Sequence, residues 1–287
     1  MKILTLNAHS LREENYEQKL EWFVEGISRE QPDIIALQEA YQTPDAPLLE
    51  PEDLSGQFPM PGCMKIHSDN HAALVAARLR EAGVDCYWAW VPIKLGYGKY
   101  DEGVAILSLG RKIRTMDQFP VSRRHDYTNW RSRAVLGVKV EGLDDWFYTV
   151  HMGWWDDESA PFLEQMKILN SLLAAKRAYG PGWLLGAFNA PSDVRQESYD
   201  ALCRCGWVDT YTVARERDDG ITVPGAIEGW HRPLSSSQST GMRLDYIWCS
   251  RLPEVRSSSV VFNGIREQIV SDHYGVMIEI EEGEPEL

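Results

Sequence analysis

The chain has 287 residues, 44% of them hydrophobic, and no obvious linker, so we expect a single domain over 1–287. Its formal net charge of −14 opposes a DNA backbone, because binding there depends on lysine and arginine neutralising phosphates, and this disfavours a nonspecific nuclease. It contains no long apolar run and starts like a strand, so we expect a cytoplasmic protein that binds neither membrane nor nucleic acid.

The N-terminal part predicts strands and helices in alternation. Residues 2–6 alternate like a strand, and the apolar run within 33–39 predicts a second, buried strand. Apolar residues at helical spacing predict an amphipathic helix over 16–29. The segment 41–67 holds too many prolines for a regular element, so we expect a long loop there, with a lid over the site as one interpretation.

The remainder continues this alternation and ends in strands. A helix is predicted over 161–178, where Pro161 suits the first turn, and another from the capping residue Ser192 to Arg204. An apolar strand starts at Gly182, and we expect the acidic tail over 281–287 to be frayed. The other predicted elements are a helix over 71–82 and strands over 87–94, 103–107, 112–121, 131–140, 145–151, 243–249, 255–262 and 274–280.

Polar residues stand where several predicted strands end. Asn7, Glu39, His151 and Asn189 each follow or close an apolar or alternating run. Any one of them alone would be read as a solvated strand end or a structural residue. A hard cation such as Mg²⁺ prefers oxygen ligands and keeps several waters, so one carboxylate beside substrate oxygens can form its site. The repeated pattern therefore favours a site at the strand ends.

Three segments carry a joint signature: Gly186–Asn189 (Gly-Ala-Phe-Asn), Arg243–Ile247 (Arg-Leu-Asp-Tyr-Ile) and Ser271–His273 (Ser-Asp-His). They resemble motifs of the endonuclease/exonuclease/phosphatase superfamily of metal-dependent phosphoesterases, in which the first motif reads Gly-Asp-Phe-Asn. The resemblance covers nearly the whole chain. It implies an α/β fold, a four-layered sandwich of two mixed β-sheets packed face to face with helices outside.

The resemblance also implies a metal site. Glu39 is expected to be the principal ligand of Mg²⁺, with Mn²⁺ as an alternative. Asn7 ends the neighbouring strand, and Asp272 is expected in the surroundings of the ion. In the reaction that the resemblance implies, water attacks phosphorus in line while the metal polarises the phosphoryl oxygens.

Two histidine–carboxylate pairs are implied as well. Glu102 is expected to orient His151, and Asp245 to orient His273. A histidine held in one tautomer by a carboxylate can hydrogen-bond or protonate a phosphoryl or leaving-group oxygen. Asn189 is expected to hold the phosphate or the catalytic aspartate.

Ala187 stands where the superfamily has the aspartate that orients and deprotonates the attacking water. Loss of a general base typically costs on the order of 10²–10⁴ in rate, so we expect this chain to be nearly inactive while it still binds metal and substrate. Because Ala187 alone among the motif residues departs from the superfamily pattern, we hypothesise an engineered Asp→Ala change at position 187. A natural pseudoenzyme is the alternative.

Substrate contacts are predicted from arginines and aromatic residues. Arg133, and less firmly Arg131, would contact phosphate because the guanidinium fork matches its geometry, although a solvated strand edge explains both nearly as well. Flat rings suit the faces of sugar rings, and the adjacent Trp154 and Trp155 cannot both point inward on a strand. The residues expected at the mouth are Trp130, Trp154, Trp155, Trp230 and His9.

The segments 4–10 and 218–230 resemble a cytoplasmic branch of the superfamily that includes a phosphatase acting on maltose 6'-phosphate. This resemblance implies a Mg²⁺-dependent phosphomonoesterase that hydrolyses a small phosphorylated sugar, maltose 6'-phosphate, to the sugar and phosphate. Two alternatives stay open: a phosphodiesterase of the nuclease or sphingomyelinase type, and a non-catalytic module that binds sugar phosphates. The oligomeric state is not predicted.

Overall fold

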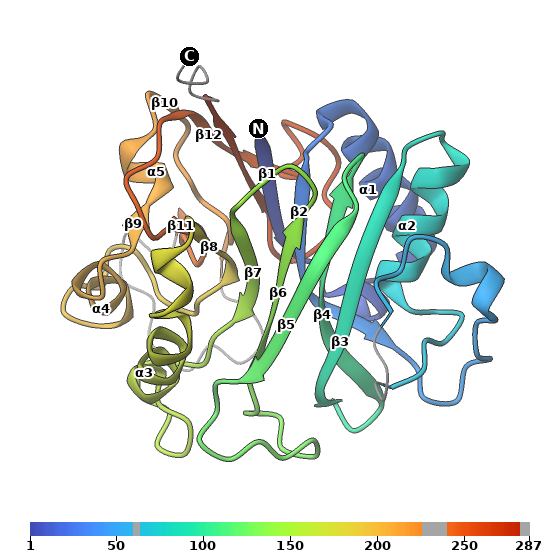
Figure 1. The fold of residues 1–287 in the computed structure, drawn as a ribbon, viewed down its shortest axis with the longest axis horizontal. Helices are drawn as coiled ribbons and strands as arrows, with labels where there is room; N and C mark the ends of the chain where they lie inside the picture. Colours follow the sequence, from blue (N-terminus) through green and yellow to red (C-terminus); the bar gives the residue numbers. More distant parts are fainter. Residues whose placement is uncertain (60–63, 226–239, 282–287) are drawn as a thin grey trace.

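The computed structural model describes residues 1–59, 64–225 and 240–281, which form two mixed β-sheets packed face to face, with helices on their outer sides (Figure 1). The predicted four-layered α/β sandwich is therefore confirmed. Trp230 and the tail from 282 lie outside the described residues. No helix within the described ranges is long and apolar enough to cross a lipid bilayer.

The larger sheet has seven strands in the order β10-β12-β13-β1-β2-β4-β3. Within it β1 and β2 run parallel, so their C-terminal ends reach the same edge, and Asn7 pairs in register with Gln38. The strands are β1 (Lys2–Asn7), β2 (Ile34–Gln42), β3 (Cys86–Gly96), β4 (Tyr100–Leu109), β10 (Glu216–Arg217), β12 (Val255–Val261) and β13 (Gly275–Ile280).

The smaller sheet has six strands in the order β5-β6-β7-β8-β11-β9. Here β7 and β8 are parallel, and β11 is antiparallel to β8. This register sets His151, Ala187 and Asp245 in one row across three neighbouring strands. The strands are β5 (Ile113–Pro120), β6 (Ala134–Val140), β7 (Trp146–His151), β8 (Gly182–Ala187), β9 (Val208–Asp209) and β11 (Asp245–Cys249).

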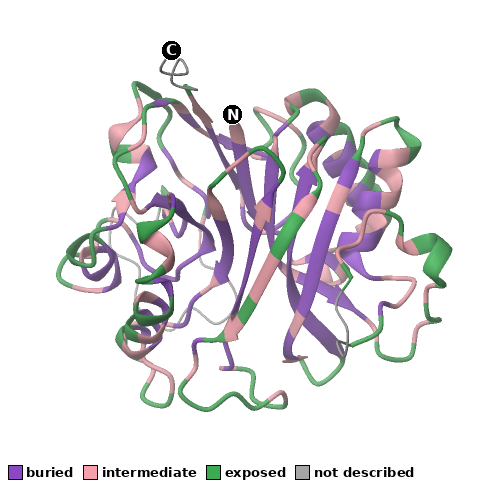
Figure 2. Cartoon of the chain, viewed as in Figure 1, coloured by how far each residue is buried: buried purple, intermediate pink, exposed green. Residues whose placement is uncertain are grey.

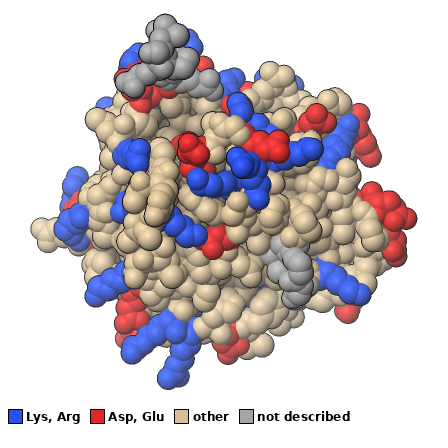
Figure 3. Space-filling view, viewed as in Figure 1, with Lys and Arg blue, Asp and Glu red and all other residues tan. Residues whose placement is uncertain are grey.

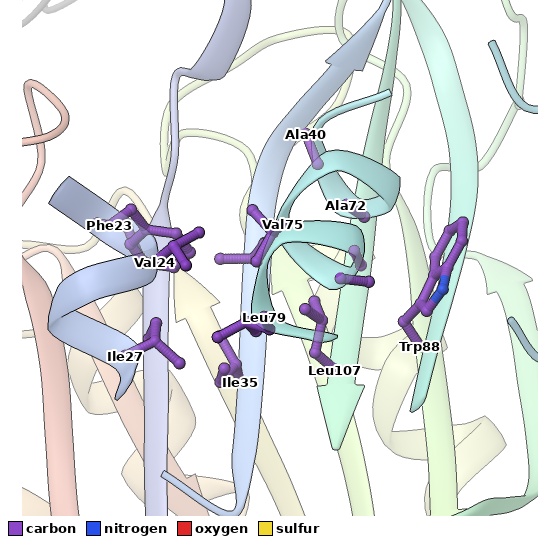
Figure 4. Packing of buried hydrophobic residues seen from close by; sticks show 14 of the residues in the cluster. Phe23, Val24, Ile27, Ile35, Ala40, Ala72, Val75, Leu79, Trp88 and Leu107 are labelled. Carbon is purple, nitrogen blue, oxygen red and sulfur yellow. The ribbon is translucent and has the colours of Figure 1, made fainter. Parts of the chain in front are cut away.

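Apolar side chains fill three spaces between the layers. On the outer side of the larger sheet, Phe23 and Leu79 from two helices pack against the strands (Figure 4). Ile106 and Leu185 belong to the core between the sheets, and Trp248 to the core on the outer side of the smaller sheet. Exposed residues lie mainly on loops and on the outer helix faces (Figure 2). The helices are α1 (Tyr16–Glu30), α2 (His71–Glu81), α3 (Phe162–Leu173), α4 (Ser198–Arg204) and α5 (Thr210–Val213), with 3-10 turns at Ser10–Arg12, Pro51–Leu54 and Lys176–Ala178.

Gln38 links the two sheets beneath the strand ends. Its Nε2 donates to Thr149 Oγ1 at 2.8 Å, and Thr149 Oγ1 in turn lies 3.2 Å from the carbonyl of Leu37. Gly186 faces this link with a φ of +144°, and a Cβ there would lie 2.9 Å from the Gln38 side chain. A larger residue at 186 would therefore disturb the packing that sets the two halves of the strand-end region together.

Several predicted boundaries were wrong. The helix predicted from Ser192 begins at Ser198, because Gln196 has a φ of 69°, and this left-handed conformation cannot continue a right-handed helix. The helix predicted over 161–178 is α-helical only through Leu173, and a 3-10 turn follows it. Strand β2 extends through Gln42, so the predicted loop starts after it.

Surface charges are mixed. Basic and acidic side chains lie side by side on the face shown in Figure 3, so the net charge of −14 is not gathered into one acidic surface there. Ion pairs join basic and acidic side chains of the chain, for example Arg215 and Glu281 at 2.8 Å. The acidic balance of the chain is therefore compatible with a local positive site.

Candidate active site

A cleft of about 450 Å³ opens where the ends of β1, β2, β7 and β8 meet, and both sheets contribute to its walls. Ala187, only 1% exposed, is not among its lining residues. The cleft is lined by Asn7, His9, Glu39, Tyr41, Lys94, Leu95, Gly96, Tyr97, Gly98, Glu102, Thr128, Trp130, Arg133, His151, Trp154, Asn189, Asp272 and His273. Of the described residues in the predicted loop 41–67, Tyr41 alone lines it.

Glu39 stands at an irregular point of β2 that turns its carboxylate into the cleft. The pairing of β2 with β4 shifts between Leu37 and Ala40, and Glu39 has a left-handed φ of 51°. Asn7 Nδ2 donates to one carboxylate oxygen at 3.0 Å and the Tyr41 hydroxyl to the other at 2.6 Å. Burial opposes ionisation, but the neighbouring His9 and these two hydrogen bonds lower the pKa of Glu39 below its ordinary value.

The oxygens around Glu39 fit a hard divalent cation. Glu39 is an ionised carboxylate in a roomy cleft, and the Asn7 amide and the Asp272 carboxylate line the same space. Burial raises the pKa of Asp272, which a bound cation would reverse. Mg²⁺ is usually held by one or two carboxylates plus waters and substrate oxygens, so this donor set suits it.

Beside this group lies a second cluster made of His9, Glu13 and Asp272, whose candidate ligand atoms fall within 4.8 Å of one another. His9 Nδ1 is 2.7 Å from Glu13 and 3.9 Å from Asp272. Lys19 forms an ion pair with Glu13. Because the Lys19 ammonium already supplies a positive charge to this cluster, the oxygens around Glu39 fit a divalent cation better.

His273 and Asp245 form a buried pair across the two sheets. His273 Nδ1 lies 2.8 Å from Asp245 Oδ2, and both residues are at least 95% buried. Burial lowers the basicity of the ring, but the Asp245 charge and hydrogen bond outweigh it and raise the pKa of His273 to about 9. At neutral pH His273 is therefore protonated, and its second N–H can donate to an anion in the cleft.

Among the described residues, His151 has no such carboxylate partner within hydrogen-bond distance. Its Nδ1 lies 3.9 Å from Glu39 and 4.0 Å from Glu102 Oε1, too far for a hydrogen bond. Glu102 instead pairs with Lys94, whose Nζ is 2.9 Å from the same oxygen. Burial and the nearby Arg133 charge hold the pKa of His151 well below its ordinary value, so the ring is neutral.

Ala187 pairs in register with His151 on one neighbouring strand and with Asp245 on the other. Residues paired in register share one face of a sheet, so the Ala187 methyl lies between the other two side chains. Asp245 Oδ1 is buried and has no hydrogen-bond partner among the described residues. Two residues on, Asn189 adopts a left-handed φ of 49° and donates to the carbonyl of Met152 at 2.8 Å. A carboxylate at 187 would adjoin His151 and Asp245, the partner of His273.

Arg133 carries a positive charge into the cleft while it is only 5% exposed. Its Nη1 donates to the carbonyls of Trp130 and Ser132 at 3.1 and 3.2 Å. Its buried Nε has no partner within the described part of the chain. Burial lowers the pKa of Arg133, and the nearby carboxylates of Glu102 and Glu39 act in the opposite direction. The charge and the planar fork of this guanidinium suit an anion in the cleft.

Aromatic residues stand at the mouth. Trp130 and Trp154 line the cleft, whereas Trp155 is outside the lining and packs against Phe162, with ring centroids 6.5 Å apart. Arg131 is also outside the lining; it stacks on the Trp130 ring at 4.2 Å and pairs with Asp157 at 2.7 Å.

Sequence reasoning missed several lining residues, among them Lys94 and Tyr97 on the opposite side. Tyr97 has a left-handed φ of 53° in the turn between β3 and β4, is 52% exposed, and has the Arg12 guanidinium 3.5 Å above its ring. The aromatic run over 87–94 hinted at a strand but not at its role in the cleft.

Several solved structures are similar to this chain. An endonuclease/exonuclease/phosphatase family protein from Leptotrichia buccalis is 30% identical, with a TM-score of 0.84, over 98% of this chain and 100% of that chain. A mannosyl-6-phosphatase from Bacteroides thetaiotaomicron is 16% identical, with a TM-score of 0.64, over 98% and 100% of the two chains. A 3' phosphatase from Neisseria bound to a product DNA hairpin is 20% identical, with a TM-score of 0.61, over the same shares. The last two likenesses concern the fold alone. No protein-family model matches the sequence, and neither does any curated protein.

Proposed function

Because the chain belongs to the endonuclease/exonuclease/phosphatase family, we propose that its site is built for a Mg²⁺-dependent phosphomonoesterase acting on a small cytoplasmic sugar phosphate. Family membership and fold support the broader class, a hydrolase of phosphate esters. The observation that carries the proposal is the meeting of three groups in one cleft. They are the ionised Glu39, the protonated His273 and the buried Arg133 with its unpartnered Nε among the described residues.

Each of these groups has a part in the proposed reaction. Glu39, with Asn7 and Asp272 nearby, would hold Mg²⁺, which when bound neutralises charge on the phosphoryl oxygens. Arg133 matches a phosphoryl group through its fork of N–H donors, and His273 donates a charged hydrogen bond to the oxygen that gains charge. His151 is neutral and faces the same space, where it orients water or the leaving group.

The methyl group of Ala187 is the feature that limits catalysis in this proposal. Its place beside His151 and Asp245 is where the family resemblance puts the carboxylate that activates water. An alanine can neither accept a proton nor orient a water, so the chain is proposed to bind metal and phosphate ester but to turn over slowly. We infer an Asp→Ala change at this position, and a natural pseudoenzyme is the competing explanation.

The substrate is proposed from the mouth of the cleft. Trp130, Trp154 and Tyr97 present aromatic surface from both sides, which suits the faces of a sugar. The neighbour from Bacteroides is described as a sugar phosphatase, which favours this substrate class. We propose maltose 6'-phosphate as the first sugar to test, on the resemblance of the segments 4–10 and 218–230.

The test is Mg²⁺- or Mn²⁺-dependent phosphate release from sugar phosphates, nucleotides and DNA by the chain and its Ala187→Asp variant. Release from a disaccharide phosphate by the aspartate form alone supports the proposal. Cleavage of DNA or of a phosphodiester by that form would move the assignment to the nuclease type. Tight sugar-phosphate binding without turnover by either form would indicate a binding module.

A further inference from the structure

Lys94 is a charged residue of the cleft to which the sequence motifs give no role. Its side chain is 5% exposed, and Nζ lies 2.9 Å from Glu102 Oε1. The pairing of β3 with β4 shifts between Pro92 and Lys94, so that Lys94 stands directly opposite Glu102. Register shifts of this kind turn side chains toward active sites. The fold therefore directs a buried ammonium group into the cleft.

The Lys94–Glu102 pair is costly to keep if it serves stability alone. Burial lowers the pKa of Lys94 and raises that of Glu102, so each charge is held against the preference of its surroundings. Desolvation commonly offsets the attraction in a buried ion pair, which makes such a pair weak evidence of stabilisation. Gly96 gives Glu102 its room, since a Cβ there would lie 2.8 Å from Oε2. The arrangement is better explained by a task in the cleft.

A second buried cation lies close by. The Arg133 charge lowers the pKa of Lys94, and both residues line the same cleft. Two like charges held near one another attract an anion with several oxygens, and the Arg133 Nε has a free donor as far as the described residues go. A phosphoryl group has this chemistry.

We propose that Lys94 binds the substrate phosphoryl group together with Arg133, and that Glu102 competes with that group for Lys94. The identity of the ester rests on the proposed function, whereas the binding of phosphate does not. Glu102 Oε1, which accepts from Lys94, is also 4.0 Å from His151 Nδ1. When Lys94 turns to the phosphoryl group, the same oxygen becomes available to His151. Lys94 is thus a substrate-binding residue, and Glu102 is a positioning residue for His151.

Calorimetric titration with inorganic phosphate tests the competition without requiring turnover. Lys94→Met is expected to weaken phosphate binding about 10- to 100-fold, the usual range for a charged hydrogen bond. Glu102→Gln is expected to strengthen it about threefold or more, because the competing carboxylate is gone. The control Lys99→Met removes a charge outside the cleft lining, where Lys99 contacts the Tyr100 hydroxyl at 2.8 Å, and is expected to leave binding unchanged.

Lys94→Met alone leaves Glu102 buried without its cation, so the double variant Lys94→Met/Glu102→Gln guards against a folding defect. It is expected to bind phosphate as weakly as Lys94→Met. The proposal is wrong if Glu102→Gln weakens phosphate binding, or if Lys94→Met behaves like Lys99→Met.

Turnover in the Ala187→Asp background separates the two roles. There Lys94→Met is expected to raise KM, whereas Glu102→Gln is expected to lower both KM and kcat. Absence of turnover with every ester would overturn the proposed function while the phosphate titrations still decide the role of Lys94.

Discussion

The two sides of the cleft differ in how completely their polar groups are partnered. On the side of the seven-stranded sheet, both Glu39 oxygens accept hydrogen bonds and Lys94 pairs with Glu102. On the side of the six-stranded sheet, Arg133 Nε and Asp245 Oδ1 are buried without a partner in the described ranges. The Ala187 methyl lies in the same row as Asp245.

This difference separates binding from chemistry. A buried polar atom without a partner costs about 1–3 kcal/mol, so a ligand that supplies a partner to such an atom recovers part of that cost. The seven-stranded side has the carboxylate that a cation needs, whereas the six-stranded side carries a methyl group, and no base, at Ala187. We therefore expect metal binding to survive in this chain and the chemical step to fail.

The largest effect is expected from restoring a carboxylate at position 187, on the side of the six-stranded sheet. Ala187→Asp is expected to raise kcat for phosphate release by about 10²–10⁴, because a positioned general base contributes that much. The matched control is Ala187→Asn, which has the same shape but cannot take a proton. An equal gain from both variants would contradict the role of a base at 187.

The next largest effect is expected from removing the charge of Glu39, on the side of the seven-stranded sheet. Glu39→Gln keeps the size of the side chain but removes its charge, and we expect it to weaken Mg²⁺ binding by roughly 100-fold or more. Loss of a residue that only hydrogen-bonds to a metal ligand typically weakens metal binding about 10–100-fold, so loss of the ligand itself is expected to cost more. Calorimetry with Mg²⁺ on the chain and on Glu39→Gln measures this. Glu13→Gln serves as the control, since Lys19 already neutralises Glu13, and a similar loss in both variants would relocate the metal to the His9 cluster.

The His273–Asp245 pair, which joins the two sides of the cleft, can be tested by the pH dependence of the metal-free chain. Asp245→Asn is expected to return the pKa of His273 from about 9 toward its ordinary value near 6.5, as read from its ring signals by NMR. A raised pKa in the folded state adds stability that is complete below the unfolded value and lost as pH rises through the folded value. The chain is thus expected to lose at most about 3 kcal/mol between pH 6.5 and 9, and Asp245→Asn to lack that loss.

Asp117→Asn removes a carboxylate paired with Lys176 on the surface, and it is the control for the loss of one negative charge. A His273 pKa that stays near 9 in Asp245→Asn would place the source of the shift elsewhere.

Asn7, Glu39, His151 and Asn189 were accessible to sequence analysis because each follows or closes a strand-like run, whereas the remaining motif residues came from the family resemblance. Parallel pairing then dictates that the ends of β1 and β2, and of β7 and β8, meet at common edges, which brings Asn7, Glu39 and His151 into one cleft. The four-layered fold followed from the same resemblance. In these cases local pattern and tertiary structure agree.

Lys94 and the start of α4 show where this reasoning stops. The burial of Lys94 depends on a register shift between β3 and β4, a non-local event that no spacing in 87–94 encodes. Ser192 has a sound capping side chain, yet the left-handed Gln196 delays the helix to Ser198. A capping side chain contributes only about 1 kcal/mol to helix stability, so it cannot override the packing of the surrounding chain.

The smallest expected effects compare the two aromatic sides of the mouth in the Ala187→Asp background. Trp130, 47% exposed, comes from the side of the six-stranded sheet, and Tyr97 from the opposite side. Aromatic stacking is worth about 0.5–1.5 kcal/mol, so each alanine variant is expected to raise KM for the sugar phosphate about two- to tenfold, with Trp130→Ala the larger because its ring is larger.

Glycerol 3-phosphate has no ring, so its KM is expected to stay the same in both variants, and Tyr179→Ala, at an exposed site outside the cleft, controls for loss of a surface aromatic. If both esters lose affinity equally, the aromatic residues shape the phosphate site itself. A change in the sugar ester alone assigns them to the sugar, and the ratio of the two effects shows which side of the cleft holds it.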